Sequence, residues 1–588
     1  MSTEELKENR PGENPAAPAN SFRALAFRDW LYIPHVLGRR ERAVLGFFVA
    51  LAIISGSTAA SLILFKLTRE TPKQGGAFRE GIIKAPERIN PLFLSNNDTD
   101  RDIATLIFAT LFYYDADGAL KPGIAEGYSV SDDGKLYNVN LKKNVLWHDG
   151  AALTADDVVY TVKTIQDPAY KSSLRPNWQG VTIERLGEYE VRFVLKQPYS
   201  PFLQNLALPI IPQHIWKKIP AEVATLADAN LRPVGSGPYR FAGLEKNEDG
   251  IITSYRLEAS DNFHLTGPYI ETIEFKLYDT EEQLIRAYQG GEIDGISAVS
   301  AKNIERVKNL GAAVANIRIP RIFAVFLNEA HPALADRAVR QALAWSIPRQ
   351  DLITKVLGGG AMEIDSPIPP GTFGYNVDIP SADFDLEKAS STLTKAGWQD
   401  LDGNGLREKK PAKKGGAPTP LKITLITSDW RDLAETANLI KEYWTKVGVE
   451  VEIRALPVNE LESAVIRPRA YDALLFGEIL GRDPDPFAFW HSSQLKDPGL
   501  NIALYHSKQV DTLLEEARRV TDRGQVEAKY KEFQKIIAED FPAIFLYSPA
   551  YFYATRPTIR GINLKTIILP SERFAETFLW HIKTKRVF

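Results

Sequence analysis

Two carboxylates, Asp483 and Asp485, have the residue type and the spacing that acid–base chemistry uses. They stand two positions apart in the run Asp-Pro-Asp-Pro-Phe. One carboxyl can act as general acid and the other as general base if a third group holds the substrate. No third partner is evident in the sequence, and a proline-stiffened loop that carries aromatic residues explains the same pattern. We therefore expect a protein that is not an enzyme.

A second acidic stretch begins at Asp400 and resembles the first half of a calcium-binding loop. Asp400 and Asp402 occupy positions 1 and 3, Asn404 occupies position 5 and Gly405 occupies position 6. Pro411 stands at position 12, where such loops place a bidentate glutamate. Alternating Asp and Gly also form tight turns without an ion. We expect a plain turn here and no metal.

Several absences narrow the remaining chemistry. The sequence has no Gly-x-x-x-x-Gly-Lys-Ser/Thr phosphate loop, no His-Glu-x-x-His motif and no Gly-x-Ser-x-Gly elbow. It has no cysteine, which excludes disulfides, cysteine–zinc sites, iron–sulfur clusters and a thiol nucleophile. The formal net charge of −3 gives no support for nucleic-acid binding. We expect no catalytic residues, no cofactor, no metal and no nucleic-acid partner.

Residues 43–65 form the most apolar stretch of the chain and contain no charged side chain. As a helix they would span roughly 34 Å, enough to cross a hydrocarbon core of about 30 Å. The alternative is a cleaved signal peptide, but the 42 residues before the stretch are long for one. Cleavage near Ala60 would also leave an apolar new N-terminus. The sequence favours an uncleaved transmembrane anchor.

The rest of the chain has the periodicity of an α/β protein, and 588 residues are too many for one compact core. Residues 421–455 form the clearest unit, with alternating apolar residues on either side of a helical stripe that Gly448 ends. This β-α-β pattern predicts parallel strands. Thr154 with Asp157 predicts a capped helix start. Further strands are expected at residues 135–141, 189–195 and 272–277, and further helices around residues 510–517 and 526–537.

Six short motifs stand in the order that is typical of one family. They are Trp147-His-Asp-Gly150 with Leu153–Tyr160, Ile211–Ile215, Pro233–Tyr239, Phe326–Asn328 with Asp336–Leu343, Ala396–Trp398 and Asp540–Leu546. Over about 500 residues, the sequence resembles the family 5 extracellular solute-binding proteins of ABC importers, the group that contains the oligopeptide- and dipeptide-binding proteins.

The resemblance implies an α/β fold of the two-lobed, type II periplasmic-binding-protein kind, in which the ligand is enclosed between lobes joined by a hinge. Lobe 1 would comprise residues 77–323 and the return segment 546–588, with an extra subdomain at about residues 120–230. Lobe 2 would comprise residues 324–545. The chain is expected to leave lobe 1 near residues 322–326 and to return near residues 545–551.

The resemblance also implies a function and an orientation. Residues 1–42 would be a cytoplasmic tail, residues 43–65 the single membrane span, residues 66–76 a tether, and the remainder extracytoplasmic. The expected function is capture of peptides, or similar small solutes, for an ABC permease and its ATPase subunits at the cell membrane. The alternative is a peptide- or solute-binding sensor or chaperone module that serves no permease.

Candidate ligand residues follow from the resemblance alone. In peptide-binding members, main-chain groups of an early lobe-1 loop meet the ligand, and Ser95, Asn96 and Asn97 lie at that position. Asn328 falls where oligopeptide binders contact the peptide backbone.

The corresponding lobe-2 loop is residues 477–487. Where peptide binders place an aspartate to hold the free amine of the ligand, this sequence has Leu480. A buried ammonium group without a carboxylate would be costly. Glu478, Asp483 or Asp485 would substitute, or the ligand lacks that amine.

Overall fold

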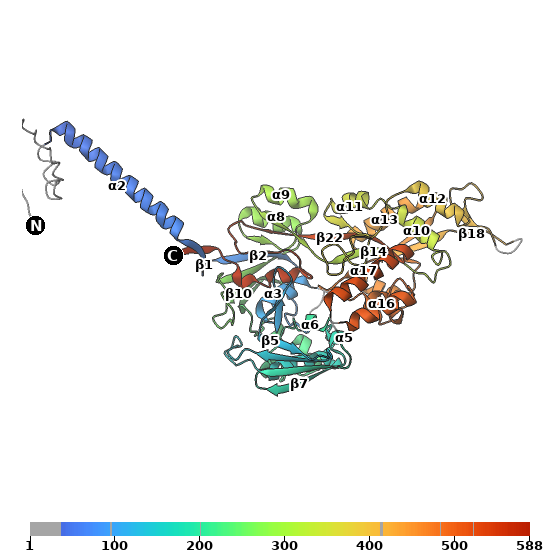
Figure 1. Cartoon of the computed structure of the whole chain (residues 1–588), viewed down its shortest axis with the longest axis horizontal. Helices are drawn as coiled ribbons and strands as arrows, with labels where there is room; N and C mark the ends of the chain where they lie inside the picture. Colours follow the sequence, from blue (N-terminus) through green and yellow to red (C-terminus); the bar gives the residue numbers. More distant parts are fainter. Residues whose placement is uncertain are drawn as a thin grey trace, which may run out of the picture. The chain divides into compact units, whose positions relative to one another are not determined.

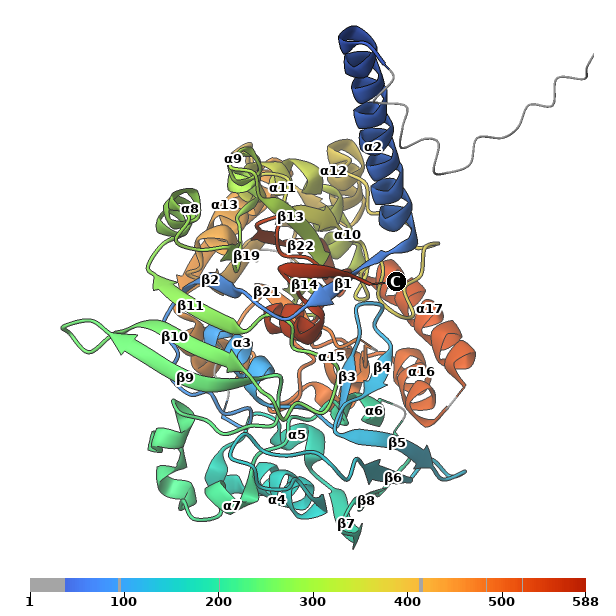
Figure 2. The same cartoon turned by 90° about the vertical axis from the view of Figure 1, so that its left-hand side faces the viewer.

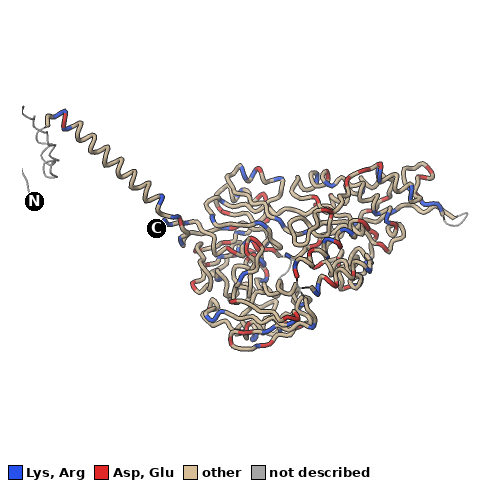
Figure 3. Tube along the Cα trace, viewed as in Figure 1, with Lys and Arg blue, Asp and Glu red and all other residues tan. Residues whose placement is uncertain are grey.

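The computed structural model describes residues 37–93, 97–199, 201–411, 416–482, 484–520 and 522–587. The chain divides into two compact units, residues 1–71 with 585–588, and residues 72–584. The first unit contains helix α2 (Arg39–Leu67), which has no buried residue and carries its charged side chains at its two ends (Figure 3). Among the described residues it is the one helix long and apolar enough to cross a membrane, a property that signal sequences share.

Strand β1 (Arg69–Lys73) follows α2 and pairs with β23 (Lys583–Val587). The Arg586 guanidinium group lies 3.6 Å from the centre of the Phe65 ring and donates a hydrogen bond of 2.9 Å to the Phe65 carbonyl oxygen. The last residues of the chain therefore cap the C-terminal end of α2, where free carbonyl groups favour a cation.

The second unit is built on one long mixed sheet (Figures 1 and 2). Along the sheet, the strands are β20 (Glu450–Leu456), β19 (Lys422–Ser428), β21 (Ala473–Ile479), β14 (Arg321–Leu327), β22 (Ala543–Thr555), β12 (Gly295–Ile296), β2 (Ala77–Ile83), β11 (Thr272–Tyr278), β10 (Ile252–Ala259) and β9 (Tyr239–Lys246). Two further strands, β13 (Ala313–Arg318) and β15 (Ala361–Glu363), pair with β22.

Strand β22 joins the two halves of this sheet. Its first residues pair antiparallel with β14, with Phe326 opposite Ala543. Its last residues pair antiparallel with β13 and β12, with Ala313 opposite Thr555. Strands β13 and β14 are separated only by Ile319 and Pro320. Two adjacent chain crossings, one outward and one returning, therefore connect the halves. The half that contains β2, with the segments packed on it, is called lobe 1 below, and the half that contains β14 is called lobe 2.

The alternation of side chains along β14 explains why its sheet is covered on both faces. Phe323, Val325 and Leu327 pack with α10 (Arg337–Trp345) and α13 (Arg431–Thr445). The intervening residues Ile322, Ala324 and Phe326 pack against α16 (Lys508–Arg519) and α17 (Arg523–Asp540) in a separate buried cluster. A strand with both faces buried has a continuous run of apolar residues in its sequence, and residues 322–327 form such a run.

The predicted β-α-β unit is confirmed. Strands β19 and β20 pair in parallel, with Ile423 opposite Val451. Helix α13, which lies between them in sequence, packs against both strands in one buried cluster. The helix ends at Thr445, and Gly448 follows with a φ of +85°, a conformation that glycine adopts without strain. A Cβ at this position would lie 2.6 Å from the Arg407 side chain.

A four-stranded antiparallel sheet forms a separate layer, in the order β5 (Ala125–Val130), β6 (Leu136–Leu141), β8 (Glu190–Leu195) and β7 (Val181–Gly187) (Figure 2). Helix α4 (Ala155–Gln166) packs beside it and begins with the predicted capping box. The Thr154 side chain accepts a hydrogen bond from the Asp156 amide, and the Asp157 carboxylate accepts one from the Thr154 amide at 3.0 Å.

Two of the family-like motifs pack directly on one another. The His148 Nε2 atom lies 3.0 Å from the Gly237 carbonyl oxygen, and the Gly235 amide donates to His148 Nδ1. A Cβ on Gly235 would come within 1.9 Å of the Ile107 carbonyl oxygen, at the end of α3 (Asp98–Ile107), so only glycine fits. Burial lowers the pKa of His148 to about 4, which keeps the imidazole neutral. These motifs therefore hold lobe 1 together.

The remaining elements of eight or more residues are α8 (Glu281–Gly290), α11 (Arg349–Leu357) and α12 (Leu386–Lys395). The shorter strands are β3 (Phe112–Tyr114), β4 (Leu120–Pro122), β16 (Trp398–Gln399), β17 (Glu408–Lys409) and β18 (Thr419–Pro420). The shorter helices include α5 (Arg175–Trp178), α6 (Phe202–Asn205), α7 (Gln213–Trp216), α9 (Ile304–Asn309), α14 (Val458–Glu460), α15 (Phe487–Trp490) and the 3₁₀ helix η8 (Pro570–Phe574).

Candidate ligand-binding site

The loop that follows β21 reaches from lobe 2 to lobe 1 through Arg482. The Arg482 Nη2 atom lies 2.5 Å from Glu572 Oε2, and Nη1 lies 3.4 Å from the Thr566 carbonyl oxygen. The guanidinium group also covers the ring of Tyr114, 4.6 Å from its centre. All three partners belong to lobe 1, so one cation links the lobe-2 loop to β3 and to the return segment.

A second contact leaves the same loop at Asp485. The Arg518 guanidinium of α16 donates to both carboxylate oxygens of Asp485, with the shortest distance 2.6 Å. The Tyr199 hydroxyl of lobe 1 donates to the same carboxylate at 3.1 Å. Arg518 also stacks on Phe487 at 3.6 Å. The charge of Asp485 is therefore paired with Arg518 of the same lobe. Its hydrogen bond with Tyr199 connects the two lobes.

Glu478 is a buried carboxyl without a partner. It lies on β21 opposite Ile322, is 5% exposed, and neither carboxyl oxygen has a hydrogen-bond partner among the described residues. Burial raises its pKa to about 8, because an apolar environment disfavours the charged form. Folding has already removed water from this carboxyl. A cationic group that binds to it would therefore gain an acceptor without a further cost of desolvating the carboxyl.

Leu480 supplies no polar group to the site. It is 3% exposed and packs in the buried cluster that also contains Ile322 and Trp490. Its amide donates to the Pro320 carbonyl oxygen at 2.9 Å, which continues the pairing of β21 beside β14. Leu480 and Glu478 are two residues apart, the spacing that places side chains on one face of a strand.

The two candidate asparagines make hydrogen bonds to their own surroundings. Asn97 caps α3 by accepting from the Thr99 amide and donates to the Ala85 carbonyl oxygen at 2.8 Å. Asn328 donates to the Tyr471 carbonyl oxygen at 2.7 Å and accepts from the Ala330 amide at 2.9 Å. Both amides thus shape the main chain around them.

Three of the sequence-predicted ligand residues, Ser95, Asn96 and Asp483, lie outside the described residues. Their contact with a ligand stays a prediction, as it does for Asn97, Asn328, Glu478, Leu480 and Asp485. Residues that sequence reasoning missed are Arg482, Glu572, Tyr114 and Tyr199. Arg482 stands inside the predicted lobe-2 loop, but nothing in the sequence identifies partners that lie about 90 or more positions away.

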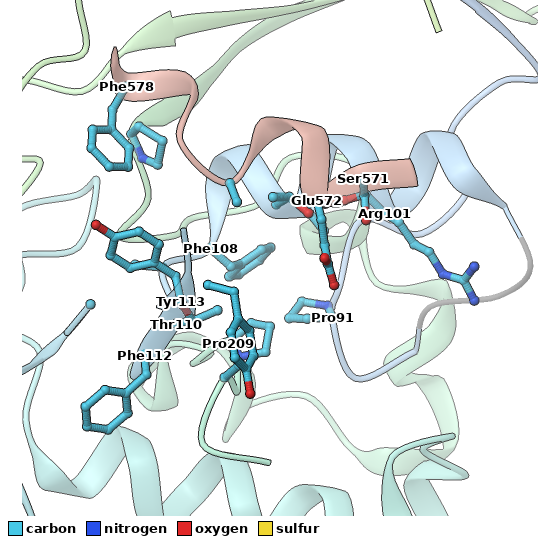
Figure 4. Close-up of a pocket in the computed structure, with 18 of the residues that line it drawn as sticks. Pro91, Arg101, Phe108, Thr110, Phe112, Tyr113, Pro209, Ser571, Glu572 and Phe578 are labelled. Atoms are coloured by element: carbon cyan, nitrogen blue, oxygen red, sulfur yellow. Dashed lines mark hydrogen bonds between the residues drawn. The ribbon is translucent and has the colours of Figure 1, made fainter. Parts of the chain in front are cut away.

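A cavity of about 250 Å³ adjoins Arg482 on the lobe-1 side (Figure 4). Figure 4 shows Phe108 and Tyr113 facing the cavity beneath η8, from which Glu572 projects toward it. Arg101 extends away from the aromatic side chains in the same view. The cavity is mostly apolar and is lined chiefly by residues of lobe 1, with Arg482 as its contribution from lobe 2.

The acidic turn that begins at Asp400 lies apart from these contacts, in lobe 2. Asp400 accepts hydrogen bonds from the amides of Gly403, Asn404 and Gly405. Glu408 brings a third carboxylate within 4.8 Å of those of Asp400 and Asp402, although all three are exposed or half-buried. These three amides donate hydrogen bonds to the Asp400 carboxylate, which is the pattern of a tight turn closed by an aspartate side chain.

The chain is similar to known proteins over most of its length. A model of the bacterial extracellular solute-binding proteins, family 5 Middle, matches residues 119–499. The chain is 30% identical over 525 residues to the oligopeptide-binding protein AppA of Bacillus subtilis, which covers 87% of this chain and 93% of that protein. It is 26% identical over 506 residues to the dipeptide-binding protein of Escherichia coli, which covers 81% of this chain and 90% of that protein.

Solved structures extend the likeness to the fold. The structure of AppA from Bacillus subtilis in complex with a nonapeptide matches with a TM-score of 0.70 at 28% identity, over 87% of this chain and 100% of that one. The substrate-binding protein CtaP of an ABC transporter from Listeria monocytogenes matches with a TM-score of 0.74 at 25% identity, over 87% and 100%. These neighbours confirm the predicted two-lobed, type II periplasmic-binding-protein fold. Because the family model matches residues 119–499 and a relative of 30% identity covers 87% of the chain, the chain belongs to the bacterial extracellular solute-binding proteins of family 5.

Proposed function

We propose that this protein is a membrane-anchored, extracytoplasmic receptor that captures peptides, or similar small solutes, between its lobes and delivers them to an ABC importer. The observation that carries the proposal is the similarity to the oligopeptide-binding protein AppA, whose solved structure holds a nonapeptide. The similarity covers nearly the whole of that protein and includes both lobes. The partners are then a permease and its ATPase subunits.

The contacts at the lobe boundary support capture by closure. Arg482 and Asp485 both cross from the lobe-2 loop to lobe 1, so this loop is the part of lobe 2 that a bound ligand would meet. Ser95, Asn96 and Asn97 would form the opposite wall, with Asn328 and Leu480 shaping the main chain on the lobe-2 side. A solute that touches both walls stabilises the closed arrangement by its differential affinity.

Glu478 is the carboxyl best suited to hold a free amine of the ligand. Asp485 is already paired with Arg518 at 2.6 Å, whereas Glu478 has no partner among the described residues. Binding an ammonium group would shift Glu478 to its charged form and give a buried ion pair. Asp483 remains the alternative within the same loop.

Anchoring rests on helix α2, whose uncharged segment covers residues 43–65. In the proposed topology, residues 1–42 face the cytoplasm and the lobes face outward. Protease added to intact cells should then remove the lobes and leave a small membrane fragment. Recovery of a soluble chain that begins near Ser61 would show instead that the helix is a cleaved signal peptide.

The test of the function uses the full-length protein in detergent. Mass spectrometry of co-purifying molecules identifies the class of solute, and calorimetric titration with a peptide library and its N-acetylated copy measures affinity. We expect peptides to bind, and Glu478→Gln to weaken binding of free-amine peptides selectively. Co-purification of no small solute, together with no heat from any library peptide, would overturn the proposal.

A further inference from the structure

The cavity beside Arg482 is referred to here as the aromatic cavity. Its lining includes Phe108, Tyr113, Phe263, His264 and Phe578, together with Arg482 and further residues of lobe 1. The rings support one another, since Tyr113 meets Phe578 edge-on at 6.0 Å and Phe263 lies 5.5 Å from Phe578. Edge-on and tilted packing of this kind holds aromatic walls in fixed orientations. Aromatic rings in mutual contact therefore form part of the lobe-1 wall of the cavity.

The charged groups at the rim are already paired with one another. Arg482 binds Glu572 at 2.5 Å, and Arg101 lies 3.5 Å from Asp98. A further buried charge placed in the cavity would lose its hydration without gaining a free counter-ion among the described lining residues, which is unfavourable. The charge arrangement thus disfavours an acidic or basic side chain as the occupant.

His264 also lines the cavity, but both of its ring nitrogens are inaccessible to solvent. Burial, with a further contribution from Lys142, lowers its pKa to about 4 against the opposing effect of the Gly123 backbone, so the ring is neutral. A neutral ring whose nitrogens face away from the open space adds to the apolar wall and offers an occupant no charge.

The volume also limits the occupant. An apolar cavity of about 150 Å³ accommodates benzene, whereas water is held only where two to four polar partners are available. At about 250 Å³, the aromatic cavity has room for one phenol or indole ring, and its mostly apolar lining offers water few partners. Burial of a ring there removes apolar surface from water on both sides, which is favourable.

We propose that the aromatic cavity is a specificity pocket that receives one aromatic side chain of the captured ligand. Arg482 closes the pocket from lobe 2, so the loop that crosses to lobe 1 also covers the bound side chain. The inference rests on the proposed function and names its ligand class: peptides that carry an aromatic residue in preference to small or charged residues.

Calorimetric titration of the full-length protein in detergent tests this selectivity. The probes are tripeptides in which each position in turn carries Tyr, Trp, Phe, Ala or Lys. At one position, we expect Tyr and Trp to bind about ten- to a hundredfold more tightly than Ala, from the burial of one ring. Lys at that position should bind no better than Ala.

Two variants assign the preference to this pocket. Ala575→Phe places a ring at a lining position and should abolish the preference for aromatic tripeptides. The matched control is Ala396→Phe, the same exchange at a half-buried alanine of lobe 2, which should leave the preference intact. Melting temperatures of both variants check that each is folded.

The outcomes separate the two proposals. Tripeptides that bind with equal affinity whatever their side chains would overturn the pocket while leaving peptide capture in place. Unchanged aromatic preference in a folded Ala575→Phe protein would also overturn it, because the preference would then arise elsewhere. Failure of every tripeptide, together with the absence of any co-purifying small solute, would overturn both proposals.

Discussion

Arg482 and Glu572 form a hydrogen-bonded ion pair of 2.5 Å across the lobe boundary, although they stand 90 positions apart in the chain. Their side chains are 12% and 29% exposed, so water screens the pair only in part. The same guanidinium group covers Tyr114 and closes one side of the aromatic cavity. One side chain therefore contributes both to the contact between the lobes and to the shape of the pocket.

Removal of this side chain should favour separation of the lobes. In Arg482→Met, the ion pair and the contact with Tyr114 are lost, at a cost of about 1–3 kcal/mol to the closed arrangement. The chain has no cysteine, so dyes can be attached at Leu226→Cys in lobe 1 and Val377→Cys in lobe 2, which are 83% and 77% exposed. Single-molecule energy transfer should report a larger open fraction for Arg482→Met without ligand.

The control for that experiment is Arg467→Met, which removes an exposed arginine paired with Glu462 within lobe 2. Exposed pairs contribute little, so the energy-transfer distribution should not move. Identical distributions for Arg482→Met and the parent protein would show that this pair does not hold the lobes together.

The buried carboxyl of Glu478 should make stability fall as pH rises. Its pKa is raised from 4.5 to about 8 in the folded protein by burial. Between these values, the unfolded chain has released the proton while the folded chain retains it. The free energy of unfolding therefore decreases as the pH rises. Glu478→Gln should flatten the decline in melting temperature between pH 5 and pH 8. Glu387→Gln, at an exposed site in lobe 2, should leave that slope unchanged.

An equally steep decline in the Glu478→Gln protein would contradict the assignment, because the titrating group would then lie elsewhere. The measurement is made without ligand, since an amine bound to Glu478 would itself favour the charged form.

The core of lobe 1 should depend strongly on Arg573. Its Nη2 atom lies 2.6 Å from Asp102 and 3.0 Å from Glu80, and all three side chains are fully or almost fully buried. Arg573→Met would leave two buried carboxylates without their cation, which costs about 3–5 kcal/mol in chemical unfolding. A second change, Glu80→Gln, should recover part of the loss by removing one of the stranded charges. Equal stability of parent and Arg573→Met would refute this account.

The turn that begins at Asp400 should behave as a turn and not as an ion site. Asp400 accepts three backbone hydrogen bonds, so Asp400→Ala should lower the free energy of unfolding by about 1 kcal/mol or more. Asp402→Ala should have a smaller effect, and neither calcium nor a chelator should move the melting temperature of the parent protein. A calcium-dependent increase that Asp402→Ala abolishes would establish a metal site that includes Glu408.

Local patterns in the sequence were sufficient for several elements of this fold. The uncharged stretch 43–65 lies within α2, the alternation and stripe of residues 421–455 form β19, α13 and β20, and Thr154 with Asp157 caps α4. Each of these features depends on residues a few positions apart, whose geometry is set by the backbone period or by a single turn. The two-lobed fold was implied by the resemblance of the ordered motifs to a known family.

The candidate site could be located in sequence only as far as its loops. The sequence indicates the loop at residues 477–487 but does not distinguish between its carboxyl groups. In the structure, Glu478 is buried without a partner, whereas Asp485 is paired with Arg518. Asn328 offered a donor and an acceptor, and the fold engages both with Tyr471 and Ala330. Whether a polar side chain is free or engaged depends on neighbours that the sequence does not order in space.

The sequence by itself thus determined the apolar helix, the strand and helix periods and the family, because these follow from residue types at short separation. Only the tertiary structure decided that Arg482 meets Glu572, that Glu478 is desolvated, and that Phe108, His264 and Phe578 enclose one cavity. These relationships join segments up to hundreds of residues apart. Long-range packing sets burial and charge pairing, and burial and charge pairing set which groups are available to a ligand.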